Sequence, residues 1–208
     1  MPSVSRRAAA SVPSGVVTLE ERMVRVTGGG DVGDQVQDLL EAIPEALIAG
    51  KRAAMPGLVV KAKAGWERAK PEILKTHTMP EADVTFIDRQ LKAMLKMKPR
   101  EQAVGALGIS STLSRFQGRS RKQDLLQADR VVMMTWCSVD AGQWAPLPGV
   151  ADVFRTLVEQ DNGQHTLAVI GVQDALKRLQ ESVQKRQAVG AKKALRDLMS
   201  FVDVLEKP

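Results

Sequence analysis

Gln102-Ala103-Val104-Gly105-Ala106 occurs again, letter for letter, as Gln187-Ala188-Val189-Gly190-Ala191, and this repetition decides the organisation of the chain. The offset from Gln102 to Gln187 is 85 residues. The same offset joins three further pairs, which are Leu91 and Leu176, Leu113 and Leu198, and Phe116 and Phe201. Self-similarity at a fixed period is typical of a chain built from repeated structural units. The pentapeptide therefore predicts an internal duplication.

Earlier parts of the two halves also correspond, at slightly larger offsets. The pairs are Ala49-Gly50 with Ala141-Gly142 and Pro56-Gly57 with Pro148-Gly149 at an offset of 92, and His77-Thr78 with His165-Thr166 at an offset of 88. Loops that are shorter in the second half explain why the offset falls along the chain. We therefore predict an all-α fold, in which two tandem, diverged four-helix units pack together as a helical bundle.

Apolar residues spaced three and four apart predict the helices of the first half. These helices run from Asp34 to a cap at Gly50, over 58–70, over 81–97, and from Pro99 onward. Pro44 is expected to kink the first helix or to mark its last turn, and Pro71 to kink the second helix or to break it into a separate final turn. The second helix carries a heptad seam of Val59, Ala62, Trp66, Ala69 and Ile73, and the third a stripe of Val84, Ile87, Leu91, Met94 and Leu95.

The glycine of the pentapeptide has a structural interpretation. Glycine inside a helix is less favourable than alanine by about 1 kcal/mol. Gly105 and Gly190 occupy matching positions and are flanked by alanines, which are small as well. We therefore predict that each glycine marks a point where another helix backbone crosses closely, in preference to a contact with a ligand.

Composition supports an all-α protein and narrows the classes of partner. Apolar residues make up 44% of the 208 residues, enough for a core, whereas aromatic residues are only 3% and there is no Tyr. The net charge of +6 is spread along the chain, and the cluster Arg119-Ser120-Arg121-Lys122 has no interleaved aromatic residues for base stacking. Nucleic acid is therefore not favoured as a partner. The single Cys137 excludes an internal disulfide.

The chain divides into three predicted segments. Residues 1–34 form a flexible N-terminal arm, 35–117 the first helical repeat, and 118–208 the second. No run of 18 apolar residues exists, so no transmembrane segment is expected. The segment after Arg6-Arg7 is too short and too broken for a signal peptide. We expect a cytoplasmic protein, or alternatively an exported one whose signal segment is missing from this chain.

Gly28-x-Gly30-x-x-Gly33 has the spacing of a dinucleotide-binding loop between a strand and a helix. That fingerprint requires a second strand ending in an acidic residue about twenty positions later. The corresponding stretch, 58–63, supplies only lysines. A nucleotide-binding enzyme using Gly28 to Gly33 is therefore the least favoured hypothesis.

The only two histidines, His77 and His165, occupy equivalent loops before the third helix of each half. His77 and Met79 offer an imidazole and a thioether two residues apart, a pair that suits copper. If the two loops meet, His77 and His165 could bind one metal or haem. The opposing interpretation is that each histidine is solvated or caps its helix, and the two interpretations remain open.

Trp144 and Trp66 are the candidate contacts for a ligand or partner, because exposed tryptophan is a frequent binding anchor. Trp144 lies between two predicted turns and is expected to be more exposed than Trp66 or Trp136. Cys137 follows Trp136 on a predicted apolar helix face and is interpreted as a core residue rather than a reactive thiol.

Three stretches resemble uncharacterised bacterial helical-bundle proteins, many of which are exported. These stretches are Gly65-Trp66-Glu67-Arg68-Ala69-Lys70-Pro71, Ile87-Asp88-Arg89-Gln90-Leu91 and Phe201-Val202-Asp203-Val204-Leu205-Glu206-Lys207. The resemblance covers residues 35–208 and implies the helical fold. It implies no catalytic residue, and the second half has no counterpart of Trp66-x-x-x-Lys70-Pro71.

No constellation of catalytic residues is found, so we predict a non-catalytic helical-bundle module that binds a protein partner or an apolar small molecule. No cofactor is predicted and the sequence fixes no oligomeric state. The alternative is a metal- or haem-binding bundle that uses His77, Met79 and His165.

Overall fold

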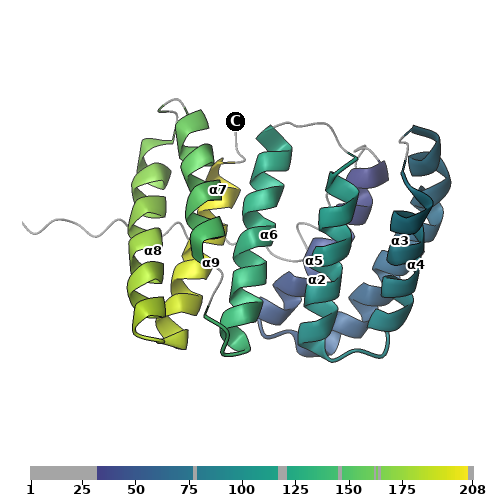
Figure 1. The fold of residues 1–208 in the computed structure, drawn as a ribbon, viewed down its shortest axis with the longest axis horizontal. Helices are drawn as coiled ribbons and strands as arrows, with labels where there is room; N and C mark the ends of the chain where they lie inside the picture. The colour runs from purple at the N-terminus through teal and green to yellow at the C-terminus, as the bar shows by residue number, and fades with distance from the viewer. Residues whose placement is uncertain are drawn as a thin grey trace, which may run out of the picture.

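The computed structural model describes residues 32–76, 79–116, 121–144, 147–161, 163 and 165–205. Within these residues the chain forms only helices (Figure 1). The helices are α2 (Val32–Ile48), η1 (Arg52–Ala54), α3 (Met55–Thr76), α4 (Glu81–Met94), α5 (Pro99–Ser114), α6 (Arg121–Asp140), α7 (Leu147–Gln160), α8 (Thr166–Gln184) and α9 (Ala188–Leu205). The prediction of an all-α bundle is confirmed. None of the described helices combines the length and the apolar character that crossing a membrane requires.

The helices pack in the same order in the two halves of the chain. In the first half α2 packs against α3 and α5, and α4 packs against α5. In the second half α6 packs against α7 and α9, and α8 packs against α9. The halves meet where α6 lies against α5 and α2, so that α3 and α4 lie at one end of the molecule and α8 at the other (Figure 1). The duplication itself remains a prediction.

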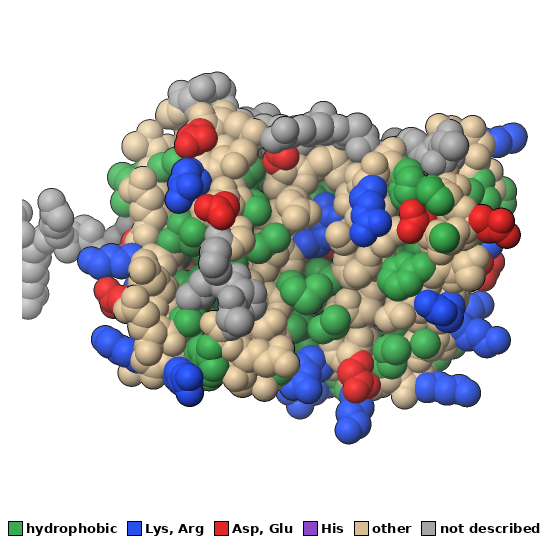
Figure 2. Space-filling model, viewed as in Figure 1, with side chains coloured by type: hydrophobic (Ala, Val, Ile, Leu, Met, Phe, Trp, Pro, Cys, Tyr) green, Lys and Arg blue, Asp and Glu red, His purple; other side chains and the backbone are tan. Residues whose placement is uncertain are grey.

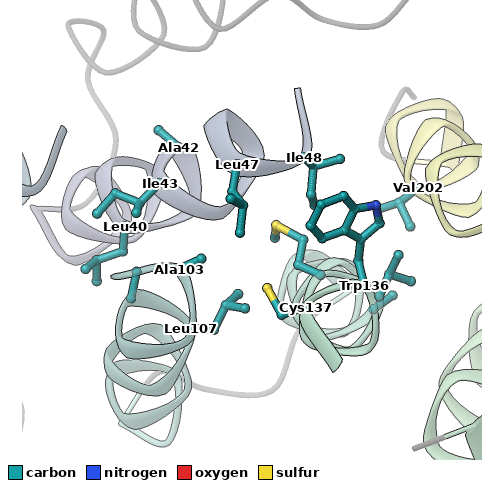
Figure 3. Packing of buried hydrophobic residues seen from close by; sticks show 14 of the residues in the cluster. Leu40, Ala42, Ile43, Leu47, Ile48, Ala103, Leu107, Trp136, Cys137 and Val202 are labelled. Carbon is teal, nitrogen blue, oxygen red and sulfur yellow. The ribbon is translucent and has the colours of Figure 1, made fainter. Parts of the chain in front are cut away.

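One hydrophobic core runs through both halves. Every residue of the predicted seam on α3 is buried, from Val59 to Ile73. Figure 3 shows how the core crosses between the halves, where Ile48 of α2 and Leu107 of α5 lie near Trp136 and Cys137 of α6, with Val202 of α9 beyond them. Burial of these residues removes apolar surface from water, which is the main force that holds the helices together.

The predicted glycine caps are confirmed at both sites. Gly50 and Gly142 have φ angles of 75° and 74°, in the left-handed region that only glycine adopts without strain. Each glycine N–H and the N–H that follows it donate to carbonyls of the preceding helix turn, such as the 2.8 Å bond from Lys51 to Ala46. These two bonds form a Schellman motif, which satisfies carbonyls that would otherwise lack partners at the helix end.

Several predicted boundaries are wrong. Pro71 does not end its helix at Lys70, because α3 continues to Thr76 and buries Ile73 in the core. Proline lacks one backbone N–H, so a single carbonyl in the previous turn loses its donor, and the helix continues beyond Pro71. Helix α4 ends at Met94 rather than Met97, and Leu95 leaves the predicted buried stripe with 45% of its surface exposed.

The first predicted helix starts slightly earlier than expected, at Val32 rather than Asp34. Residues 1–31, which contain most of the predicted arm, lie outside the described residues. The predicted boundary between 117 and 118 lies outside them as well.

The prediction that another helix backbone crosses closely at the repeated glycines is wrong, because the nearest atoms at both glycines belong to side chains. A Cβ on Gly105 would lie 2.8 Å from Gln90 Nε2 of α4, and one on Gly190 would lie 2.5 Å from Ser182 Oγ of α8. The atoms that approach each glycine therefore belong to side chains of the neighbouring helix and not to its backbone. Gly105 is in the middle of α5, whereas Gly190 is in the first turn of α9.

Candidate binding site

An apolar groove lies between α4 and α5, and we call it the α4/α5 groove. Its volume is about 550 Å³, and it is lined by Phe86, Gln90, Met97, Arg100, Glu101, Val104, Gly105 and Gly108. Figure 2 shows exposed hydrophobic side chains over α4 and α5, with basic side chains around them. A space of this size is in the range of small-molecule sites, which span about 300 to 1,000 Å³.

The floor of the groove is open at Gly108 of α5. A Cβ on Gly108 would find only one neighbouring atom within 4 Å, the Phe86 Cζ at 4.0 Å. A larger residue at position 108 would therefore fill the groove without displacing the helices. Val104, on the same helix, leaves 41% of its surface exposed and supplies an apolar rim. The exposed part of Val104 does not contribute to the stability of the fold, because only apolar surface that is removed from water is stabilising.

A second, smaller pocket borders the groove, and we call it the cationic pocket. Its volume is about 200 Å³, and it is lined by Leu47, Arg52, Lys98, Pro99, Arg100, Glu101 and Asp140. Arg100 and Glu101 line both the pocket and the groove, so the two spaces adjoin. Asp140 belongs to α6, so the cationic pocket lies where the two halves of the chain meet.

The charges of the cationic pocket do not neutralise one another. Asp140 pairs with Lys192 of α9. Glu101 accepts a 2.9 Å hydrogen bond from the backbone N–H of Lys98 and so caps the start of α5. Within the described part of the chain, the side chains of Arg52, Lys98 and Arg100 have no hydrogen bond or ion pair of their own. The pocket therefore presents three cations together with Glu101, whose carboxylate keeps its negative charge when a backbone N–H binds it.

Trp66 does not reach the surface. Its side chain is 0% exposed at the centre of the α3 seam. Its Nε1–H donates a 2.6 Å hydrogen bond to Asp88 Oδ1, and Lys70 Nζ lies 2.6 Å from Asp88 Oδ2. Partial burial raises the pKa of Asp88, but the hydrogen bonds from Lys70 and Trp66 outweigh that effect, and the pKa lies below its ordinary value. Trp66 and Lys70 therefore both bind Asp88, and the Trp66-x-x-x-Lys70 pattern of the sequence links α3 to α4.

Trp144 lies just after the Gly142 cap and is half-buried against the core. It is more exposed than Trp66 and Trp136, as the sequence predicts. It lines neither the α4/α5 groove nor the cationic pocket. Its role as a contact for a partner stays a prediction.

The described metal-ligand candidates are not brought together. Met79 precedes α4 and is buried, whereas His165 precedes α8, at the opposite end of the molecule (Figure 1). His77 lies outside the described residues. Among the residues that are described, no three His, Cys, Asp or Glu side chains form a group that could hold a metal ion.

His165 is held by a buried carboxylate. Its Nδ1 lies 2.6 Å from Asp161 Oδ1, and its backbone N–H donates to Asp161 Oδ2 at 2.8 Å. Because Nδ1 faces Asp161, Nε2 is the ring nitrogen that remains for another partner. His165 is the N-cap residue directly before α8, in the loop that the sequence predicts, but its side chain makes no cap hydrogen bond.

Sequence reasoning missed a buried polar cluster between the two halves. Arg130 of α6 donates from NH1 to the carbonyl of Ser110 at 3.0 Å and to Ser114 Oγ, both on α5. Ser110 Oγ donates to Glu41 of α2 at 3.3 Å. Burial lowers the pKa of Arg130, and the nearby charges of Glu41 and Asp129 counteract that effect. Nothing in the periodicity distinguishes Arg130 from a solvated residue.

Two further sequence candidates have structural roles in the described residues. Cys137 is buried, and burial raises the pKa of its thiol to about 11, so the reactive thiolate is scarce at neutral pH. Gly33 forms part of α2, whereas Gly28 and Gly30 lie outside the described residues. No protein-family model, curated protein or solved structure matches the chain.

Proposed function

We propose that the protein is a non-catalytic binding module and that its ligand occupies the α4/α5 groove. One observation carries the proposal, namely an apolar space of about 550 Å³ with a glycine floor and an exposed Val104 at its rim. The side chains that supply most of its surface, such as Phe86 and Met97, bind apolar groups and perform no chemistry. This supports binding of an apolar small molecule over catalysis.

The experiment measures binding of N-phenylnaphthylamine, a neutral apolar dye whose fluorescence rises when it leaves water. We expect the full-length protein to bind it, and Gly108→Leu to abolish that binding, because the added side chain would occupy the groove next to Phe86. Circular dichroism checks that the variant remains folded.

Gly149→Leu is the matched control. Gly149 is on α7, outside the groove, and a Cβ there would also have a single neighbour at 4.0 Å, Val131 Cγ1. The same substitution therefore adds the same side chain on another helix and should leave dye binding unchanged. A folded Gly108→Leu protein that binds the dye as tightly as the wild type would refute the proposed site.

A further inference from the structure

The α4/α5 groove and the cationic pocket share two lining residues, and we refer to the two spaces together as the cleft. Arg100 and Glu101 line both spaces. Along α5 the cleft reaches from Arg100 to Gly108, which is about 12 Å at the helical rise of 1.5 Å per residue. One end of the cleft is apolar and the other is positively charged.

The basic end has the composition of a site for an anion. Arg52, Lys98 and Arg100 come from three separate segments, η1, the residue before α5, and α5 itself. Both carboxylates of the pocket are engaged, Glu101 by the start of α5 and Asp140 by Lys192. An anion in the pocket would therefore meet Arg52 and Arg100, which have no ion pair of their own among the described residues, and also the negative charge of Glu101.

We infer that the ligand is an amphipathic carboxylate of medium chain length. Its carboxylate binds in the cationic pocket against Arg52, Lys98 and Arg100, and its alkyl chain lies along Phe86, Met97 and Val104 in the groove. This inference rests on the proposed function, and it adds the chemical class of the ligand. Guanidinium groups match a carboxylate well because they can donate two parallel hydrogen bonds to it.

The test compares three molecules with the same chain, decanoate, decanol and decyltrimethylammonium. Each is titrated against the full-length protein with bound N-phenylnaphthylamine, and displacement of the dye is measured. We expect decanoate to displace the dye at a concentration roughly tenfold lower than decanol, because two or three partly exposed ion pairs form. Decyltrimethylammonium should be the weakest, and the advantage of decanoate should shrink as salt is added.

The double variant Arg52→Gln with Lys98→Gln tests where the head group binds, because both residues line the cationic pocket and neither lines the groove. We expect it to remove most of the advantage of decanoate while leaving displacement by decanol unchanged. Arg115→Gln is the control, because Arg115 is exposed at the opposite end of α5, far from the pocket. This control should keep the full preference for decanoate.

The outcomes separate this inference from the proposed function. If the dye binds and Gly108→Leu abolishes its binding, but decanol competes as well as decanoate, the groove stands and the carboxylate inference is overturned. The inference is also overturned if decanoate keeps its advantage in the double variant, since the head group would then bind elsewhere. If the wild-type protein does not bind the dye, the proposed function fails first.

Discussion

The strongest test of the packing uses one substitution at two glycines that face phenylalanine rings. Gly171 of α8 lies under Phe201 of α9, and a Cβ on Gly171 would be 2.1 Å from Phe201 Cζ and 2.3 Å from its Cε1. Gly108 of α5 faces Phe86 of α4, where the corresponding distance is 4.0 Å. The methyl group of an alanine would therefore overlap the rigid Phe201 ring at position 171, whereas at position 108 it would make an ordinary van der Waals contact.

The magnitudes follow from two opposing effects. Replacing glycine by alanine within a helix stabilises the protein by about 1 kcal/mol at either site, because the unfolded chain loses freedom. At Gly171 the methyl group must also displace the Phe201 ring, and overpacking of this kind costs about 1 to 3 kcal/mol. We expect Gly108→Ala to stabilise the protein by about 0.5 to 1 kcal/mol and Gly171→Ala to lie about 1 to 3 kcal/mol below it.

The assay is unfolding in urea, followed by circular dichroism and by tryptophan fluorescence. Agreement of the two probes supports a two-state analysis. In a thermal melt each 1 kcal/mol should shift the midpoint by about 2 to 4 °C for a chain of this length. Phe201→Leu provides a further control, since shortening the side chain should relieve the clash and make Gly171→Ala less harmful in that background.

The result that would refute the reasoning is Gly171→Ala as stable as Gly108→Ala, or more so. In that case the Phe201 ring would not lie on Gly171, and the close packing of α8 on α9 would be wrong. Equal penalties for Gly171→Ala in the wild-type and Phe201→Leu backgrounds would lead to the same conclusion.

Three further measurements address the polar residues. Arg130→Leu should destabilise the protein by about 3 kcal/mol or more, because it removes one partner of a buried charged cluster, and adding Glu41→Gln should recover part of the loss in urea unfolding. The folded pKa of Asp88 is below its ordinary value of 3.8, so the stability that the charged carboxylate contributes is fully present above that value and is lost as pH falls through the folded pKa. The difference in unfolding free energy between the wild type and Asp88→Asn should therefore become smaller only in that acid range. A difference that stays the same there would contradict the pairing of Asp88 with Lys70. Cys137 should react about a hundredfold more slowly with a thiol reagent in the native state than in urea, and equal rates would contradict its burial.

Periodicity predicts the core well, because burial on a helix depends on spacing along the chain. The seam from Val59 to Ile73 is buried as expected, as are Ile87, Leu91 and Met94 of the next predicted stripe. The prediction that Leu95 is buried is wrong, since Leu95 is the C-cap residue of α4 and leaves 45% of its surface exposed. Arg130 could not be predicted, since its partners are on helices distant in sequence.

The α4/α5 groove could not be predicted for a related reason. Sequence identifies Gly105 and Val104 as members of a repeated motif, but the hollow depends on the distance between Gly108 and Phe86 on separate helices. An exposed Val104 in a helix whose other face is buried is the one signal that could have indicated the site. Because the sequence does not predict which way α5 faces, Val104 cannot be distinguished from a core valine by sequence alone.

At the offsets of the proposed duplication, the second half does not repeat the residues that form the groove. The repeated pentapeptide leaves a valine exposed in each half, Val104 at 41% and Val189 at 86%. The other elements of the cleft differ at the offsets that relate the halves, where Phe86 corresponds to Gly171, Gly108 to Lys193 and Arg52 to Trp144. At these positions the second half thus lacks the aromatic wall, the glycine floor and one cation. Its aromatic ring between α8 and α9 is Phe201, which belongs to α9 and not to α8.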